Sequence, residues 1–400
     1  MPFTTEQRSL VLGLLSGSAL TLLATGLFYY LTQPSSHDES SVSRPPEIVE
    51  GVDGLIGNTP LVKIRSLSDA TGCTILGKAE FLNPGGSSKD RVALNMIRSA
   101  EEAGILKPHT GSTIFEGTSG STGISIAMIA RARGYKAWIV MPDDMAKEKY
   151  ELLEKLGATV EKVRPASIID KNQYVNRARE RALAFAEGDA RGYFGDQFEN
   201  EANFEVHYGS TGPELYKQTH GRVDALVLGA GTGGTLSGLT CYFKERLPKV
   251  KVFLADPPGS GLYNKIKYNT MYAPTEREGT RRRHQVDTVV EGIGLNRLTR
   301  NFDTGRRLVD DAFRVTDTES VKMSRYLVRE DGLFVGSSSA VNCVAAVRVA
   351  RQLGPGHVIV TMLSDSGQRH LTKFWSDEYL ESQGIPHELK DDETLEDFIQ

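Results

Sequence analysis

The feature that most constrains the fold is a regular alternation of short apolar runs and helical patterns between residues 112 and 363. The runs have the length of buried strands, and the segments between them carry apolar residues at helical spacing. Such alternation predicts parallel sheets with helices on both faces. The predicted strands cover 112–117, 135–142, 158–163, 223–231, 250–257 and 357–363, and the predicted helices cover 124–134, 145–157 and 235–247.

Length and composition extend this prediction. We expect an α/β protein of two lobes, each with a mostly parallel sheet flanked by helices, because 400 residues suffice for two lobes that share a site. The formal net charge of -4 gives no reason to expect a nucleic-acid partner. Three widely separated cysteines, Cys73, Cys241 and Cys343, form no metal-ligand cluster. We therefore expect no metal site and a reducing compartment.

The N-terminus departs from this pattern. Residues 10–31 are continuously apolar or small, and no charged residue occurs from Ser9 to Ser36. As a helix, the run would span about 33 Å, which exceeds a hydrocarbon core of about 30 Å. It is too long for a signal peptide and lacks a clear cleavage site. We expect a transmembrane anchor over residues 1–32 and a flexible tether over 33–48.

The residues around this run predict a membrane and an orientation. A short N-terminal flank with Arg8 and the free cysteines favour an anchor whose catalytic part faces a reducing cytosol. By analogy with signal-anchored proteins, we expect a single pass through the mitochondrial outer membrane, with the endoplasmic reticulum membrane as the alternative.

Two glycine-rich loops join predicted strands to predicted helices. Residues 116–123, EGTSGSTG, place hydroxyls at a helix start, where unpaired amides favour an anion; a capped helix start fits them equally. Residues 229–235, GAGTGGT, match a dinucleotide-binding GxGxxG pattern, with Asp256 placed as the ribose-binding acid. The same glycines, with Thr232 and Thr235, could instead form a cup for one phosphate or a packing turn without a ligand.

A serine-rich helix start and one lysine complete the candidate chemistry. Residues 332–341, GLFVGSSSAV, form a strand-like run that enters a helix; a serine there could face a ring nitrogen or only cap the helix. Lys89 ends the flexible polar run of NPGGSSKDR, residues 83–91. A lone loop lysine is usually solvated, whereas burial can lower the pKa of a lysine that forms a Schiff base. An anion loop, a phosphate cup and such a lysine together predict pyridoxal 5'-phosphate as cofactor.

These stretches resemble the cysteine synthase and cystathionine β-synthase family of pyridoxal-phosphate enzymes. The resemblance extends from about Gly51 to about Trp375 and includes six motifs in the family's order, which disfavours the dinucleotide interpretation. The motifs are IGNTPLV (56–62), NPGGSSKDR (83–91), TSGSTG (118–123), the segment 195–215, GAGTGGT (229–235) and LSDSGQRHLTKF (363–374).

The resemblance implies a tryptophan synthase β-like fold and a homodimer. The catalytic domain would cover residues 49–386. Its smaller lobe, about 88–195, would be inserted in a larger lobe formed by 49–87 and 196–386. The last segment, 387–400, is interpreted as an acidic solvated tail.

The resemblance also implies roles for individual residues. Lys89 would form the Schiff base and serve as the general base, and Asp365 would lie beside the cofactor ring. Ser338 would face the ring nitrogen, with Ser337 and Ser339 as alternatives. The phosphate would be held by Gly231, Thr232, Gly233, Gly234 and Thr235. The substrate carboxylate would be held by Thr118, Ser119, Thr122 and Gln197.

The chain departs from the family pattern at one cofactor position. The family's carboxylate loop usually reads TSGNTG, with the asparagine bonded to the ring hydroxyl of the cofactor, and Ser121 stands there in this chain. A serine is shorter but can still make one hydrogen bond, so the tilt of the cofactor and the substrate preference are put in question. Extra residues near 164–192 and 268–288 receive no role from the sequence.

The resulting hypothesis is a cysteine synthase that replaces the acetate of O-acetylserine with sulfide. A second hypothesis keeps the cofactor and changes the substrates: cystathionine β-synthase, serine sulfhydrylase or serine/threonine dehydratase. A third hypothesis is a catalytically inactive, membrane-tethered binding protein, for which Ser121 is the only support in the sequence.

Overall fold

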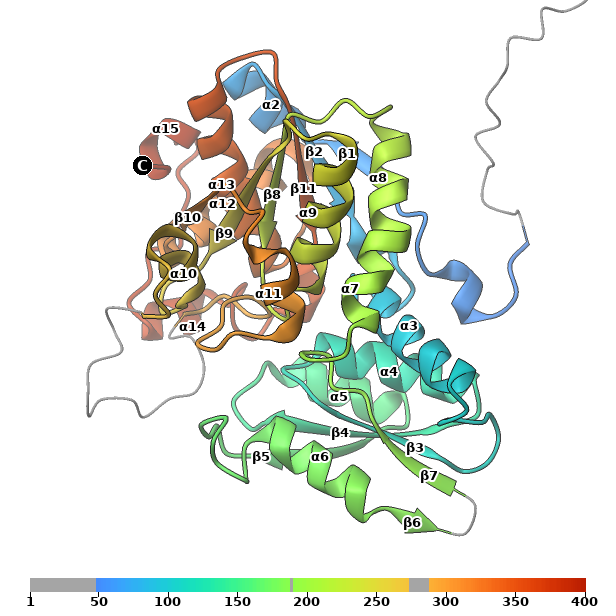
Figure 1. The fold of residues 1–400 in the computed structure, drawn as a ribbon. Helices are drawn as coiled ribbons and strands as arrows, with labels where there is room; N and C mark the ends of the chain where they lie inside the picture. Colours follow the sequence, from blue (N-terminus) through green and yellow to red (C-terminus); the bar gives the residue numbers. More distant parts are fainter. Residues whose placement is uncertain (1–47, 188–189, 273–287) are drawn as a thin grey trace, which may run out of the picture. The chain divides into compact units, whose positions relative to one another are not determined.

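The computed structural model describes residues 48–187, 190–272 and 288–400. The predicted membrane span, nearly all of the tether and most of the extra segment 268–288 lie outside the described residues. Residues 50–400 form one compact unit with a larger and a smaller sheet (Figure 1). The lobe limits at residues 88 and 195 stay a prediction.

The larger sheet combines the first and last strands of the compact unit. Its order is β1-β2-β11-β8-β9-β10, and β1 runs antiparallel to β2 whereas the other pairs are parallel. Val358 of β11 is opposite Thr74 of β2, so segments far apart in the sequence lie side by side (Figure 1). The strands are β1 (Leu61–Lys63), β2 (Thr74–Ala79), β8 (Ala225–Gly229), β9 (Lys251–Asp256), β10 (Asp311–Arg314) and β11 (Val358–Leu363).

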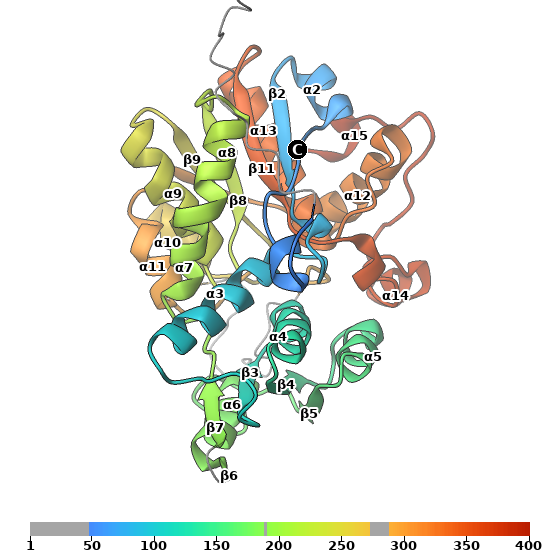
Figure 2. The ribbon, with the colours of Figure 1, turned by 90° about the vertical axis from the view of Figure 1, so that its right-hand side faces the viewer.

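Both faces of the larger sheet are buried. Val227 of β8 points into the core under α2, α12 and α13, while its neighbour Leu228 points into the core under α8, α9 and α11. A parallel sheet with helices on both faces requires this continuous apolar pattern. The helices are α2 (Arg65–Thr71), α8 (Gly212–Gln218), α9 (Gly234–Arg246), α10 (Leu262–Tyr268), α11 (Arg300–Arg306), α12 (Asp317–Asp331) and α13 (Ser337–Leu353) (Figure 2).

The smaller sheet has the order β5-β4-β3-β7-β6, with only the short β6 antiparallel to its neighbour. Ile139 of β4 packs against α3, α4 and α5 on one face. On the other face, Phe115 of β3 stacks on Trp138 and contacts Phe185, which follows α6. The elements are α3 (Lys89–Glu102), β3 (Thr113–Gly117), α4 (Ser121–Ala132), β4 (Lys136–Pro142), α5 (Lys147–Lys155), β5 (Thr159–Val163), α6 (Tyr174–Ala184), β6 (Ala186–Glu187), β7 (Ala190–Phe194) and α7 (Ala202–Val206).

The fold corrects two sequence expectations, the strand-like run that begins at residue 332 and the solvated C-terminal tail. The six predicted strands are present with small shifts at their ends, but the strand-like run 332–335 is not a strand. It contributes one isolated bridge, between Val335 and Ser366, because Gly332 ends α12 in a left-handed conformation and α13 begins at Ser337.

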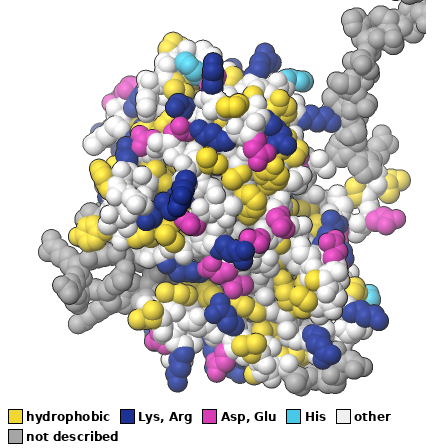
Figure 3. Space-filling view, viewed as in Figure 1, with side chains coloured by type: hydrophobic (Ala, Val, Ile, Leu, Met, Phe, Trp, Pro, Cys, Tyr) yellow, Lys and Arg dark blue, Asp and Glu magenta, His cyan; other side chains and the backbone are white. Residues whose placement is uncertain are grey.

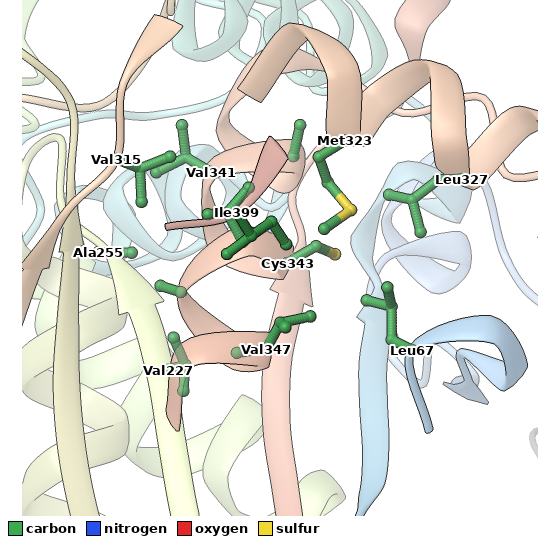
Figure 4. Close-up of a cluster of buried hydrophobic side chains, with 14 of the residues drawn as sticks. Leu67, Val227, Ala255, Val315, Met323, Leu327, Val341, Cys343, Val347 and Ile399 are labelled. Atoms are coloured by element: carbon green, nitrogen blue, oxygen red, sulfur yellow. The ribbon is translucent and has the colours of Figure 1, made fainter. Parts of the chain in front are cut away.

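The C-terminal segment is packed against the larger sheet, so the prediction of a solvated tail is wrong. After α14 (Asp377–Ser382), the chain reaches α15 (Leu395–Phe398), where Leu395, Phe398 and Ile399 are buried. Ile399 lies beside Val341 and Cys343 of α13 (Figure 4), and its carbonyl accepts a hydrogen bond from Arg351 at 2.9 Å. Asp391, Asp392, Glu396 and Asp397 around them are exposed, so a prediction from charge missed the buried apolar residues.

Within the described ranges, no helix has the length and hydropathy needed to cross a bilayer. The longest described helix, α13, has 17 residues and therefore a length of about 26 Å, less than a hydrocarbon core of about 30 Å. On the face drawn in Figure 3, basic and acidic side chains are interspersed with apolar ones.

Candidate functional site

One cavity of about 320 Å³ lies among the loops that follow β3, β8 and β11. This position is where open parallel sheets place their ligands. All the predicted site residues except Gly234 line it, and they come from segments more than 200 residues apart. The lining residues among them are Lys89, Thr118, Ser119, Ser121, Thr122, Gln197, Gly231, Thr232, Gly233, Thr235, Ser338 and Asp365.

Lys89 is the first residue of α3, and its two neighbours fix its position. The Asp90 carboxylate accepts hydrogen bonds from the Gly85 amide and the Ser125 hydroxyl, both at 2.5 Å, and so closes the glycine turn before the lysine. The Arg91 guanidinium is buried and binds Glu80 through two nitrogens, at 2.8 Å each, and also Glu214. The flexible run of the sequence is thus held by charged contacts on its C-terminal side.

The Lys89 amine is suited to chemistry rather than to solvation. Among the described residues, no hydrogen bond or ion pair reaches its Nζ atom. Burial lowers the pKa of Lys89, and the negative charges of Asp365 and Glu80 oppose that shift. A lysine in such surroundings more readily becomes the neutral amine that a Schiff base requires.

The GAGTGGT loop forms a cradle without room for side chains. A Cβ atom on Gly231 would lie 2.2 Å from the Gly292 carbonyl oxygen, and one on Gly234 would lie 2.0 Å from Asn203 Oδ1. Gly233 has a φ of 92°, which favours glycine. The loop leads into α9, whose first amides are available to an anion. Gly234 therefore packs closely against Asn203 and is not among the residues that line the cavity.

The position of Asp256 contradicts the dinucleotide interpretation, which requires an acidic residue that can bind a ribose. Asp256 is fully buried at the end of β9, and its Oδ2 atom accepts the Tyr263 amide at 2.7 Å. Burial raises the pKa of Asp256 to about 7, as expected for a carboxyl enclosed by protein. The residue supports the start of α10 and presents no carboxylate to a ribose.

The TSGSTG loop connects β3 to α4 and lines the same cavity. The Thr118 hydroxyl accepts the Gly120 amide at 3.1 Å, and the Thr122 hydroxyl donates to Gln197 Oε1 at 2.5 Å. Gly120 has a φ of 140°. Ser121, at the departure from the family pattern, accepts a hydrogen bond from Arg369 Nη1 at 3.3 Å. Hydroxyls, amides and an amide side chain therefore converge where a carboxylate could bind.

The three serines at the start of α13 are distinguished by their partners. The Ser337 hydroxyl accepts the Glu291 amide at 3.0 Å, and the Ser339 hydroxyl accepts the Ser364 amide at 2.8 Å. Ser338 lines the cavity, and no described residue forms a hydrogen bond with its hydroxyl. Of the three, Ser338 is the one with a hydroxyl available to a ligand.

The structure also brings to the cavity residues that sequence reasoning missed. Lys149, Glu291 and His370 line it and form a charged chain with Asp365. His370 lies in a motif that was identified, but its pairing with Asp365 required the three-dimensional turn of η4 (Gly367–Arg369). No pattern in the sequence links Lys149 to Glu291, which are 142 residues apart.

The extra residues near 164–192 supply part of the wall. Ala166–Ile168 and Gln173–Val175 line the cavity on the side of the smaller sheet. Of the second extra segment, Thr288 lines the cavity, and residues 273–287 are outside the described part of the chain.

These residues fit pyridoxal 5'-phosphate. No described residue pairs with the Lys89 amine or with the Ser338 hydroxyl, and the glycine cradle lies at a helix start that suits a phosphate. Asp365 Oδ1 is buried and accepts no hydrogen bond within the described residues, so a polar group is still expected on the cavity side.

The relatives of the chain agree with this fit. "Cysteine synthase 2" of Emericella nidulans is 60% identical over 86% of this chain and 84% of its own length. "Putative mitochondrial cysteine synthase" of Saccharomyces cerevisiae is 55% identical over 88% of this chain and 89% of its own. The crystal structure of a hydrogen sulfide-producing enzyme from Fusobacterium nucleatum superposes with a TM-score of 0.68 at 32% identity, over 81% of this chain and all of that one.

The yeast name bears on the predicted location. It calls that relative mitochondrial and does not mention an outer-membrane anchor. The prediction of a single-pass outer-membrane anchor is therefore wrong.

The family assignment rests on most of the chain. The sequence profile described as "Pyridoxal-phosphate dependent enzyme" matches residues 52–365, which contain every predicted site residue. The chain belongs to the pyridoxal-phosphate-dependent enzyme family.

Proposed function

We propose that this protein is a cysteine synthase, which replaces the acetate of O-acetylserine with sulfide to give L-cysteine. The observation that carries the proposal is the cavity in which the Lys89 amine shares one space with the TSGSTG loop and the glycine cradle. The names of relatives at 55–60% identity support the same reaction.

The residues divide into two binding groups. The cradle of Gly231, Thr232, Gly233 and Thr235 would hold the cofactor phosphate, with Gly234 in the same loop, and Ser338 would face the ring nitrogen. Ser121 and Asp365 would lie beside the ring. Thr118, Ser119, Thr122 and Gln197 would bind the substrate carboxylate through hydroxyl, amide and backbone donors.

Bound pyridoxal phosphate supplies an electron sink that makes the substrate's α-proton acidic. The chain's own contribution to that step is the Lys89 amine, which takes the α-proton as a general base and later returns it. The Thr122–Gln197 hydrogen bond ties α4 to the segment after β7 and so holds in place the loop that would orient the substrate.

The test uses purified full-length protein with added pyridoxal phosphate. Wild type is expected to show a visible cofactor band and to form cysteine from O-acetylserine and sulfide. Lys89→Ala is expected to lose cysteine formation by at least about 100-fold, the usual contribution of a general base. Lys147→Ala, whose side chain is 76% exposed on α5, is the matched control and should retain wild-type activity.

Assays with other substrates distinguish the alternative activities. Cysteine from serine but not from O-acetylserine would indicate a serine sulfhydrylase, and cystathionine from homocysteine would indicate a cystathionine β-synthase. A protein that retains no cofactor would contradict the proposal and favour an inactive binding protein. We also propose a homodimer, which sedimentation of the same preparation would detect.

A further inference from the structure

Four buried side chains with alternating charges extend from α5 to the wall beside Lys89. Lys149 of α5 forms an ion pair with Glu291. His370 Nδ1 lies 3.3 Å from Glu291 Oε2, and His370 Nε2 lies 3.0 Å from Asp365 Oδ2. No side chain of the four is more than 10% exposed, so each charge is offset by its neighbour and not by water.

This series of four charged side chains ends beside the segment that carries Lys89. Ser87 and Asp365 form an isolated β-bridge, and the Ser88 amide donates to the Ser364 carbonyl at 3.2 Å. These backbone contacts hold Asp365 next to the residue that begins α3. Asp365 and Lys89 both line the cavity, and the negative charge of Asp365 acts on the Lys89 amine.

The ion pairs favour the charged forms of Asp365, His370 and Glu291. Burial alone would raise the pKa of Asp365, but the adjacent His370 lowers it below the usual range. Burial alone would lower the pKa of His370, but Asp365 and Glu291 raise it. Glu291 in turn has a lowered pKa, since Lys149 outweighs the effect of burial. These directions favour an imidazolium at His370, which lies between the carboxylates of Glu291 and Asp365.

Other charged groups face these four side chains. Lys373 Nζ lies 3.9 Å from Glu291 Oε1, whereas Lys149 binds the other carboxylate oxygen, Oε2. The Arg369 guanidinium acts on both Asp365 and Asp90. These cations favour the ionised carboxylates, but in the described part of the chain only His370 forms an ion pair with Asp365.

We propose that His370, held by Glu291, is a positioning residue that keeps the Asp365 carboxylate ionised and fixed in the cavity wall beside Lys89. The inference rests on the proposed function of Lys89 as a base. The Asp365 charge stabilises a positive charge on Nζ, so the buried amine can still accept a proton. Lys149 offsets the charge of Glu291, so the four side chains together carry no net charge.

The first test measures His370 directly in the holoenzyme labelled with ¹⁵N-histidine. The protein has 8 histidines, and the His370 signal is identified by its absence in His370→Asn. Wild-type His370 should be an imidazolium at pH 7, and Glu291→Gln should lower its titration midpoint by about one pH unit or more. Glu151→Gln, whose side chain is 57% exposed, is the matched control and should change nothing. A neutral His370 in wild type, or an equal midpoint in Glu291→Gln, would overturn the proposal.

The second test measures the effect at Lys89 through the cofactor band. His370→Asn removes the imidazolium, so Asp365 takes up a proton more readily and its charge near Lys89 is lost. The pH midpoint of the band should then fall by about one unit or more relative to wild type. An unchanged midpoint would overturn the link to Lys89. Neither test involves turnover, so a protein that passes both but forms no cysteine would contradict the proposed function alone.

Discussion

At the residue scale, the cost of burying charge explains which side chains are paired. Arg91 is buried with two carboxylates around its guanidinium, so each charge has an opposite charge in contact. Glu116 of β3 is the contrary case: it is fully buried, and among the described residues no cation forms an ion pair with it. Burial raises the pKa of Glu116 well above its usual range, and the charge of Asp196 raises it further.

This shift makes stability depend on pH. Because folded Glu116 keeps a proton that the unfolded chain releases above about pH 4.3, stability falls as the pH rises from there toward the folded pKa. Glu116→Gln should remove this loss, which is at most about 1.4 kcal/mol per pH unit. Urea midpoints at pH 5 and pH 8 measure it, with the exposed Glu154→Gln as control. Equal pH dependence in Glu116→Gln and wild type would show that Glu116 is ionised.

At the element scale, α13 illustrates how one helix start serves both packing and binding. Ser337 and Ser339 accept backbone amides from neighbouring segments, whereas Ser338 between them faces the cavity. A helix turns by about 100° per residue, so three consecutive serines must face different surroundings.

Replacing Ser338 and replacing Ser339 should therefore have different effects on stability and on cofactor binding. Ser339→Ala leaves the Ser364 amide unpaired and should reduce the free energy of unfolding by about 1–3 kcal/mol. Ser338→Ala removes no hydrogen bond within the described chain, so it should change stability by less than about 0.5 kcal/mol and weaken cofactor binding instead. Urea unfolding and titration with pyridoxal phosphate separate the two effects. The reverse pattern would assign the ligand-facing hydroxyl to Ser339.

At the scale of the whole molecule, the C-terminal segment completes the core of the larger sheet. The Phe398 ring lies 5.9 Å from that of Tyr326 in α12, and Arg348 binds the carbonyl of Gln400 at 2.9 Å. Figure 4 shows Ile399 among side chains from α12, α13 and the sheet. The end of the chain is thus part of the folded unit.

Removing a buried side chain from this C-terminal segment should lower the stability of the protein. Phe398→Ala should reduce the free energy of unfolding by about 3–5 kcal/mol, the range for removing a buried phenylalanine. Tyr268→Ala, a residue that is 68% exposed, should change it by less than about 0.5 kcal/mol. Equal effects of the two substitutions, measured by urea unfolding, would mean that the C-terminal segment does not pack in solution.

The sequence by itself determined the alternation of strands and helices, because apolar periodicity and glycine turns depend on neighbouring residues. It also located Lys89, the glycine cradle and the carboxylate loop, since each belongs to a motif of a few consecutive residues. Only the tertiary structure distinguished Ser338 from its alternatives Ser337 and Ser339, paired His370 with Asp365, and joined Lys149 to Glu291. These contacts depend on which loops meet across the fold, and no local pattern of charge or hydropathy specifies such meetings. For the same reason, the acidic composition of residues 387–400 gave the wrong result, since burial of Phe398 and Ile399 is decided by the surface that α12 and α13 present.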